Sequence, residues 1–136
     1  MIQPDNETER TVLNFFVTLG SGDLDRVRPL CHPNVIWRVM GRGIPGEGVH
    51  HGVDAIFAFI VPIRALFAPG SPEVEITSLA SKGNQVIFEA KGGGKLKDGR
   101  EYDNYYVMAL EVADGLIREI REYMDTFYVN RLLGSR

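Results

Sequence analysis

The chain has little of what marks secreted, membrane-spanning or nucleic-acid-binding proteins. It holds one cysteine, Cys31, among 136 residues, so no disulfide can form within the chain and no oxidising compartment is needed. Residues 1–10 are polar and acidic, without the basic and then apolar pattern of a signal peptide. The longest apolar run, residues 55–63, contains Pro62 and is far shorter than the about 20 residues of a membrane-spanning helix. We therefore expect a soluble, cytoplasmic protein with no membrane partner.

Positive charge and histidine are also scarce. The 15 lysines and arginines are outnumbered by 18 acidic residues, which gives a net charge of −3, and they are scattered rather than gathered in a stripe. Nucleic acid is therefore not an expected partner. His50 and His51 are adjacent and cannot form the i, i+4 pair of a helical metal site, and His32 is remote from them. We expect no metal and no cofactor.

What is present is the composition of a globular domain. Hydrophobic residues make up 44% of the chain and charged residues 24%. A chain of this length can bury roughly two thirds of its unfolded surface, which is enough for one core without disulfides. The sequence shows no repeat and no linker. We expect one domain over residues 1–136, with its core in about residues 7–130.

The first half of the chain predicts three helices. Asp5 or Asn6 can cap the first one, with Glu9 placed to complete a capping box from Asn6. Apolar residues then recur at helical spacing as far as Gly20. A short second helix follows. The third is predicted over residues 53–67, with a kink at Pro62, which removes one backbone donor.

The second half predicts strands. After a break at residues 69–72, four alternating runs follow one another, joined at turn dipeptides such as Asp98-Gly99 and Asp114-Gly115. A short strand is also expected at residues 35–39, followed by a glycine-rich loop at residues 41–52. This order predicts an α+β domain, in which a mostly antiparallel curved sheet has its helices on one concave face.

Several short stretches carry a resemblance to a known superfamily. They are SGDLD at residues 21–25, PNVIW at 33–37, GVDAI at 52–56, DGLI at 114–117 and REYMD at 121–125. Over roughly residues 7–130 the chain resembles the nuclear transport factor 2-like superfamily, with its SnoaL-like polyketide cyclases, ketosteroid isomerases, limonene epoxide hydrolases and phenazine-pathway relatives. The resemblance implies a cone-shaped sheet wrapped around three N-terminal helices, also called a cystatin-like fold. It further implies a deep apolar pocket at the open end and a dimer formed through the outer sheet face.

The resemblance directs attention to the end of the last strand. Asp125 matches the last aspartate of the limonene epoxide hydrolase set, whereas Phe15 and Arg38 stand near the tyrosine and the base of ketosteroid isomerase. If Asp125 faces an apolar pocket, loss of hydration raises its pKa toward a value useful for general acid or base catalysis. The alternative is a carboxylate that caps the end of the strand or the following turn.

Polar side chains on neighbouring strands complete the expected site. Asn104 and Tyr106 alternate onto one face of their strand, where they could bind a substrate oxygen, and Tyr123 shares a face with Asp125. The catalytic candidates are therefore Asp125, Tyr106 and Asn104. The residues expected to contact substrate are Tyr123, Trp37, Val39, Phe16, Phe57, Phe88 and Met108.

Two functions remain open from the sequence. The first is an isomerase, cyclase or hydrolase that acts on a small hydrophobic, oxygen-bearing molecule by cofactor-independent acid/base chemistry. The alternative is a non-catalytic ligand-binding or dimerisation module of the same fold. In both cases we expect a homodimer through the outer sheet face, because the strand at residues 105–110 carries apolar and aromatic residues on both sides.

Overall fold

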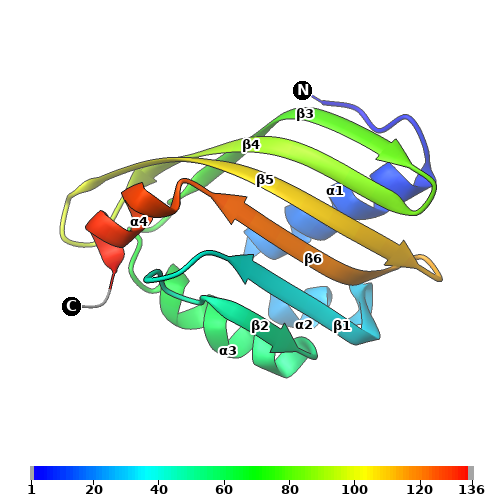
Figure 1. Cartoon of the computed structure of the whole chain (residues 1–136), viewed down its shortest axis with the longest axis horizontal. Helices are drawn as coiled ribbons and strands as arrows, with labels where there is room; N and C mark the ends of the chain where they lie inside the picture. The colour runs from blue at the N-terminus through cyan, green and yellow to red at the C-terminus, as the bar shows by residue number, and fades with distance from the viewer. Residues whose placement is uncertain (1, 135–136) are drawn as a thin grey trace.

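The computed structural model describes residues 2–134 as a curved sheet with helices packed on one side (Figure 1). The helices are α1 (Glu7–Ser21), α2 (Leu24–Val27), the 3-10 turn η1 (Arg28–Leu30), α3 (Val53–Arg64) and α4 (Thr126–Leu133). The strands are β1 (Cys31–Met40), β2 (Gly48–His51), β3 (Glu73–Lys82), β4 (Gln85–Lys95), β5 (Glu101–Ala113) and β6 (Leu116–Met124).

The predicted α+β class is confirmed, with two corrections of detail. The expected loop at residues 41–52 contains β2, which pairs with β1, and the third helix ends at Arg64 rather than at residue 67. None of the helices formed by residues 2–134 is long and apolar enough to cross a bilayer.

The sheet brings the first and last strands together. Its order is β2-β1-β6-β5-β4-β3, in which β1 and β6 run parallel and all other neighbours run antiparallel. In this register Trp37 lies opposite Ile120 and Val39 lies opposite Glu122. Side chains far apart in the sequence therefore share the centre of the concave face.

Helix α1 begins at the predicted cap, Asn6, but ends at Gly22 rather than at the predicted Gly20. The Asn6 side chain accepts a hydrogen bond from the Glu9 amide at 2.9 Å, and Gly22 ends the helix in the left-handed conformation, with φ of 81°. The Glu9 carboxylate also accepts a hydrogen bond from Ser81 on β3. This contact ties the helix to the edge of the sheet, so that its buried stripe covers the concave face.

An irregularity in β6 decides which side chains face the helices. Glu111 pairs with Glu119, but the next residue along β5, Val112, pairs with Ile117, so Arg118 is an extra residue in β6. From that point the alternation is reversed. Ile120 is buried on the concave side, and Glu122 and Met124 share its face and are partly buried there.

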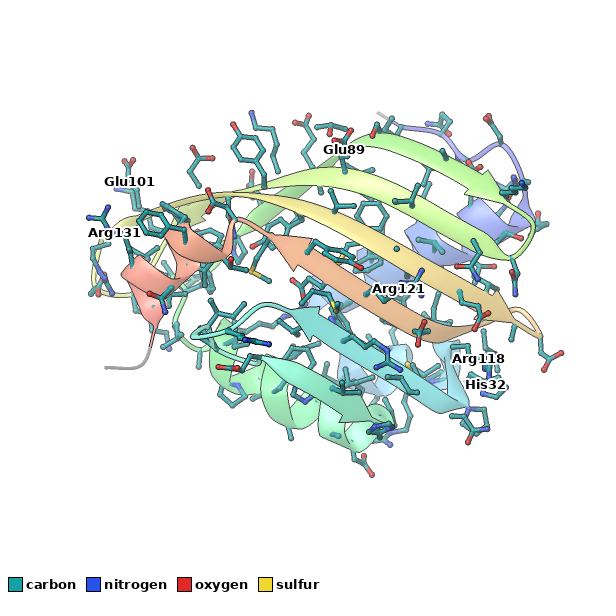
Figure 2. The ribbon with its side chains drawn as sticks, viewed as in Figure 1. His32, Glu89, Glu101, Arg118, Arg121 and Arg131 are labelled. Atoms are coloured by element: carbon teal, nitrogen blue, oxygen red, sulfur yellow. The ribbon has the colours of Figure 1, made fainter. Side chains whose placement is uncertain are left out.

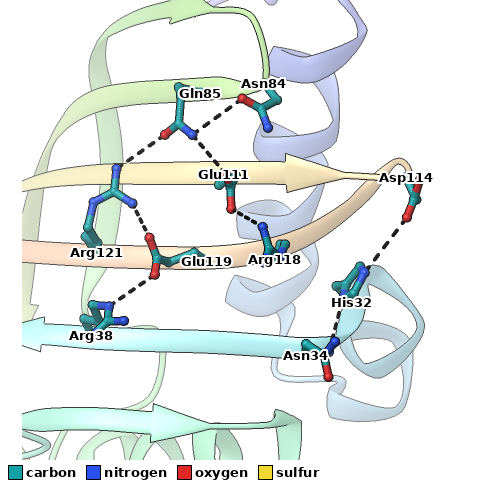
Figure 3. A network of polar contacts seen from close by, with 10 residues as sticks. All are labelled: His32, Asn34, Arg38, Asn84, Gln85, Glu111, Asp114, Arg118, Glu119 and Arg121. Atoms are coloured by element: carbon teal, nitrogen blue, oxygen red, sulfur yellow. Dashed lines mark hydrogen bonds and ion pairs between the residues drawn. The ribbon is translucent and has the colours of Figure 1, made fainter.

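Charged side chains cover the opposite, outer face of the sheet (Figure 2). Arg38 Nε lies 3.1 Å from Glu119, whose other oxygen accepts a hydrogen bond from Arg121 (Figure 3). Arg118 and Glu111 form a further pair at 2.9 Å. The two sides of the sheet therefore differ sharply, with an apolar concave face and a charged outer face.

Candidate functional site

A cavity of about 800 Å³ lies between the concave face of the sheet and the helices. Its wall is mostly apolar and includes side chains from every layer of the fold. The lining residues include Phe16, Val17, Trp37, Val39, Phe59, Arg64, Phe88, Tyr102, Tyr106, Met108, Glu122 and Met124. A cavity of this size matches the range of small-molecule sites.

Glu122 is the acidic group on the concave face of β6. Its Oε1 accepts a hydrogen bond from the indole nitrogen of Trp37 at 3.0 Å. The side chain keeps some accessible surface because it faces the cavity, but it lies deep within the protein. Loss of hydration raises the pKa of Glu122 to about 7, and the hydrogen bond from Trp37 acts in the opposite direction. This carboxyl group can therefore both accept and donate a proton near neutral pH.

Aromatic rings fix the position of Trp37. Its ring meets Phe16 edge-on at 6.4 Å and Phe59 at 5.5 Å between centroids, and Phe16 meets Phe88 at 5.0 Å. Trp37 is buried within this cluster. Aromatic packing therefore fixes the position of the Trp37 indole N–H that donates to Glu122.

Two tyrosine hydroxyls form the second polar feature of the cavity. The hydroxyl groups of Tyr102 and Tyr106 hydrogen-bond to each other, and Asn104 Nδ2 donates to Tyr102 at 3.0 Å. Burial raises the pKa of both tyrosines, and the nearby charge of Glu122 adds to this effect. Both phenols therefore stay protonated and can act as hydrogen-bond donors.

The direction of one of these hydrogen bonds follows from Asn104. Its Oδ1 accepts from the backbone N–H of Tyr105 at 2.9 Å, so its amide nitrogen must be the group that faces Tyr102. Tyr102 accepts that bond, and either hydroxyl can be the donor in the bond between Tyr102 and Tyr106. When Tyr102 donates, the hydroxyl proton of Tyr106 is available to a ligand in the cavity.

Asp125 and Tyr123 do not share this location. After the extra residue in β6, both lie on the outer side of the sheet, where they line a separate pocket of about 460 Å³. The Asp125 carboxylate accepts the backbone N–H of Tyr128 at 3.1 Å and so caps α4. The structure therefore gives Asp125 the capping contact that the sequence had left as the alternative.

The other expected residues are found mostly where the sequence placed them. The predicted wall residues that line the cavity are Phe16, Trp37, Val39, Phe88 and Met108, together with Tyr106. Asn104 is buried behind Tyr102 rather than exposed to the cavity. Phe57 lies outside the lining and packs under Arg28, whose guanidinium is 5.2 Å from the ring centroid.

Glu122 is the residue that the sequence reasoning missed. A usable signal was present, because Ile120, Glu122 and Met124 alternate at the spacing of one strand face. Regular alternation from buried Ile117 would instead place residues 119, 121, 123 and 125 on the concave face, which the extra residue in β6 prevents.

Metal ligation finds no support among the described residues. Within residues 2–134, no three His, Cys, Asp or Glu side chains gather as ligands would. His50 Nε2 donates a hydrogen bond to Gly46 O, 2.6 Å away, and its ring stacks on Phe59 at 4.1 Å between centroids.

Comparisons with known proteins agree with this architecture. No curated protein matches the chain. Among solved structures, an NTF2-like protein from Burkholderia xenovorans LB400 has a TM-score of 0.76 and 24% identity, covering 95% of this chain and 96% of its own. TerC co-crystallised with polyporic acid has a TM-score of 0.79 and 17% identity, with coverage of 93% and 98%. A candidate SnoaL-like polyketide cyclase from Jannaschia sp. CCS1 has a TM-score of 0.79 and 20% identity, with coverage of 99% of both chains.

The likeness to these structures supports the fold alone. The family assignment comes from the sequence, in which residues 12–120 match the model of the SnoaL-like domain. This match spans most of α1 and continues through β1 to the middle of β6. The chain therefore belongs to the SnoaL-like domain family.

Proposed function

We propose that the protein is a cofactor-independent enzyme that moves a proton on a small hydrophobic ketone, with Glu122 as the acid/base group. The observation that carries this proposal is a carboxyl group with a pKa of about 7, held by Trp37 in an apolar cavity. A group with this pKa is matched to proton transfer from carbon near neutral pH. The hydroxyl groups of Tyr102 and Tyr106 line the same cavity as Glu122, which adds hydrogen-bonding groups for a substrate oxygen beside the acid/base group.

The two polar features divide the chemistry between them. Ionised Glu122 takes a proton from the carbon next to the substrate carbonyl, and the electron pair of that C–H bond moves onto the carbonyl oxygen. Tyr106 donates a hydrogen bond to the enolate oxygen as its charge develops. Where a C=C bond is conjugated with the enolate, protonated Glu122 returns the proton to the far carbon of that bond, which isomerises the substrate. Where a second carbonyl is within reach, the enolate carbon attacks it and closes a ring, and protonated Glu122 gives its proton to the alkoxide that forms.

The family and its solved relatives are consistent with this substrate class. TerC, a structural neighbour, was crystallised with polyporic acid, an oxygen-bearing organic ligand. The walls around Glu122 are aromatic and apolar, which favours a hydrophobic carbon skeleton. Polar recognition is then concentrated at one carbonyl oxygen.

Proton exchange tests the proposal without knowledge of the natural substrate. 2-Tetralone is incubated with the protein in D₂O, and loss of its α-proton signals is followed by NMR. We expect the wild-type protein to accelerate exchange and Glu122→Gln to lower the enzymatic rate at least about 10²-fold, as for general acid/base groups.

Asp125→Asn is the matched control, because it removes the carboxylate on the outer face. It should leave the exchange rate unchanged. Equal exchange by the wild-type and Glu122→Gln proteins would reject the assignment, and binding of 2-tetralone without any exchange would favour a ligand-binding module.

A further inference from the structure

Arg64, the last residue of α3, adds a positive side chain to the cavity wall. Its Nη2 donates to the backbone oxygen of Leu19 near the end of α1, and its Nη1 lies beside Gly22. The side chain is half-buried. Burial is the cause that lowers the pKa of Arg64, and no carboxylate contributes to the change.

The contact with Leu19 gives Arg64 one structural role, since the carbonyl groups at a helix C-terminus attract a cation. This role uses one of the five N–H donors of a guanidinium group. The ion pairs among residues 2–134 do not include Arg64. Guanidinium donors therefore remain on a half-buried, charged side chain that lines the cavity, and no carboxylate among residues 2–134 pairs with them.

The position of Arg64 is distinct from that of the acid/base group. The exposed members of the lining lie on the second half of α1 and at the start of β3, and they mark the mouth of the cavity: Val17, Gly20, Gly70, Glu73 and Val74. Arg64 is on the α1 side of this mouth through its contact with Leu19. Glu122 lies on β6 and accepts its hydrogen bond from Trp37 on β1, so different elements of the wall hold the two groups.

We propose that Arg64 binds an acidic oxygen at the outer end of the substrate. The preferred ligands are then apolar molecules that carry a carboxylate, or another oxyanion of the same geometry, in addition to the carbonyl that reacts. Glu73 and ionised Glu122 line the same cavity and oppose an anion, so selectivity for acids depends on Arg64. The inference deepens the proposed function and rests on it for the reacting end of the ligand.

Binding of a matched acid and amide tests this inference without any reaction. Isothermal titration calorimetry at pH 8 compares 4-phenylbutyrate with 4-phenylbutanamide, which differ in charge at one end. We expect the wild-type protein to bind the acid roughly tenfold more tightly, the size of a charge-assisted hydrogen bond. Arg64→Gln should abolish or reverse that preference and leave the affinity for the amide unchanged.

Arg26→Gln removes the same charge from an exposed site outside the cavity and should keep the preference. A melting curve of each variant establishes that it is folded, and Arg64→Lys, which retains the charge, should keep part of the preference. The inference is overturned if the wild-type protein binds both compounds equally, binds neither, or keeps its preference in Arg64→Gln.

Glu122→Gln separates this inference from the proposed function. It should retain the preference for the acid, because its role is in proton transfer. Loss of selectivity in Arg64→Gln, with normal proton exchange in Glu122→Gln, would reject the proposed reaction and keep the anion site. An unchanged preference for the acid in Arg64→Gln, with loss of proton exchange in Glu122→Gln, would reject the anion site and keep the proposed reaction.

Discussion

Glu122 opposes the stability of the fold in which it lies. Its pKa is about 7 in the folded protein, compared with an ordinary value of 4.5. Folding therefore favours the protonated carboxyl group. The contribution of protonated Glu122 to the unfolding free energy is complete below about pH 4.5. It is lost as the pH rises through about 7, because ionisation of the buried carboxyl group then costs free energy.

Glu122→Gln should remove this dependence, since the amide keeps an oxygen that can accept from Trp37. We expect the variant to match the wild-type protein in unfolding free energy at pH 4.5 and to exceed it by up to about 3 kcal/mol at pH 8. Urea unfolding at the two pH values measures the difference. The difference in unfolding free energy between Glu122→Gln and the wild-type protein is compared at the two pH values. An equal difference at pH 8 and pH 4.5 would contradict the raised pKa of Glu122.

Much of the cavity could be predicted from the sequence at the level of single residues. Tyr106, Trp37 and Phe88 follow from strand alternation, which places residues of equal parity on one face. Glu122 could not be identified securely, because its face depends on whether Arg118 is paired or extra in β6. That choice is made by the packing of the whole sheet, and the alternation of Ile120, Glu122 and Met124 does not decide it alone.

Helix α4 depends on Asp125 as its N-cap, which gives this residue a measurable role outside the chemistry. Asp125→Ala should lower the unfolding free energy by about 1 kcal/mol, because the Tyr128 amide loses its acceptor. Asp125→Asn retains a capping oxygen and should cost little. Urea denaturation distinguishes them, and loss of proton exchange in both variants at normal stability would return Asp125 to the mechanism.

Strand β4 determines the position of the Tyr106 ring through Gly92. A Cβ at Gly92 would lie 2.9 Å from Cε2 of Tyr106, closer than real contacts allow. Gly92→Ala should therefore displace the ring and lower the rate of proton exchange roughly tenfold or more, because donor placement is critical.

The neighbouring Gly93 supplies the control for this element. A Cβ there meets only Tyr102 O, at 4.0 Å, so Gly93→Ala should leave the exchange rate near that of the wild type. Equal rates for all three proteins would show that the position of the Tyr106 ring does not matter. The two substitutions differ by one position and point to opposite faces of the strand.

At the scale of elements, the order of helices and strands could be predicted from caps, turns and periodicity. Asn6 and the Asp114-Gly115 turn act as expected, and both turn residues have positive φ, 55° and 73°. Strand β2 could not be predicted from its glycine-rich sequence. It is a strand because β1 offers it a partner, which is a tertiary effect that outweighs local preference.

For the whole molecule, we predict a homodimer through the outer face of the sheet. This face combines exposed aromatic residues, such as Tyr105 at 58% exposure, with the network around Glu119 (Figure 3). A two-fold axis can pair such a mixed surface with itself. We expect light scattering to give twice the mass of the chain at micromolar concentration.

Tyr105→Glu should convert the dimer to a monomer by placing a charge within the apolar part of the interface. Val61→Glu, on the exposed side of α3, introduces the same charge away from the sheet and should leave the dimer intact. A wild-type mass equal to that of one chain would exclude this interface.

The hydrogen bond between Trp37 and Glu122 also has an optical consequence. Trp37 is the single tryptophan of the chain, so all indole emission comes from the ring that touches the ionisable carboxyl group. A protonated carboxyl group quenches an adjacent indole more strongly than a carboxylate does. The intrinsic fluorescence of the protein should therefore titrate with Glu122, which makes the charge of one buried group visible without a label.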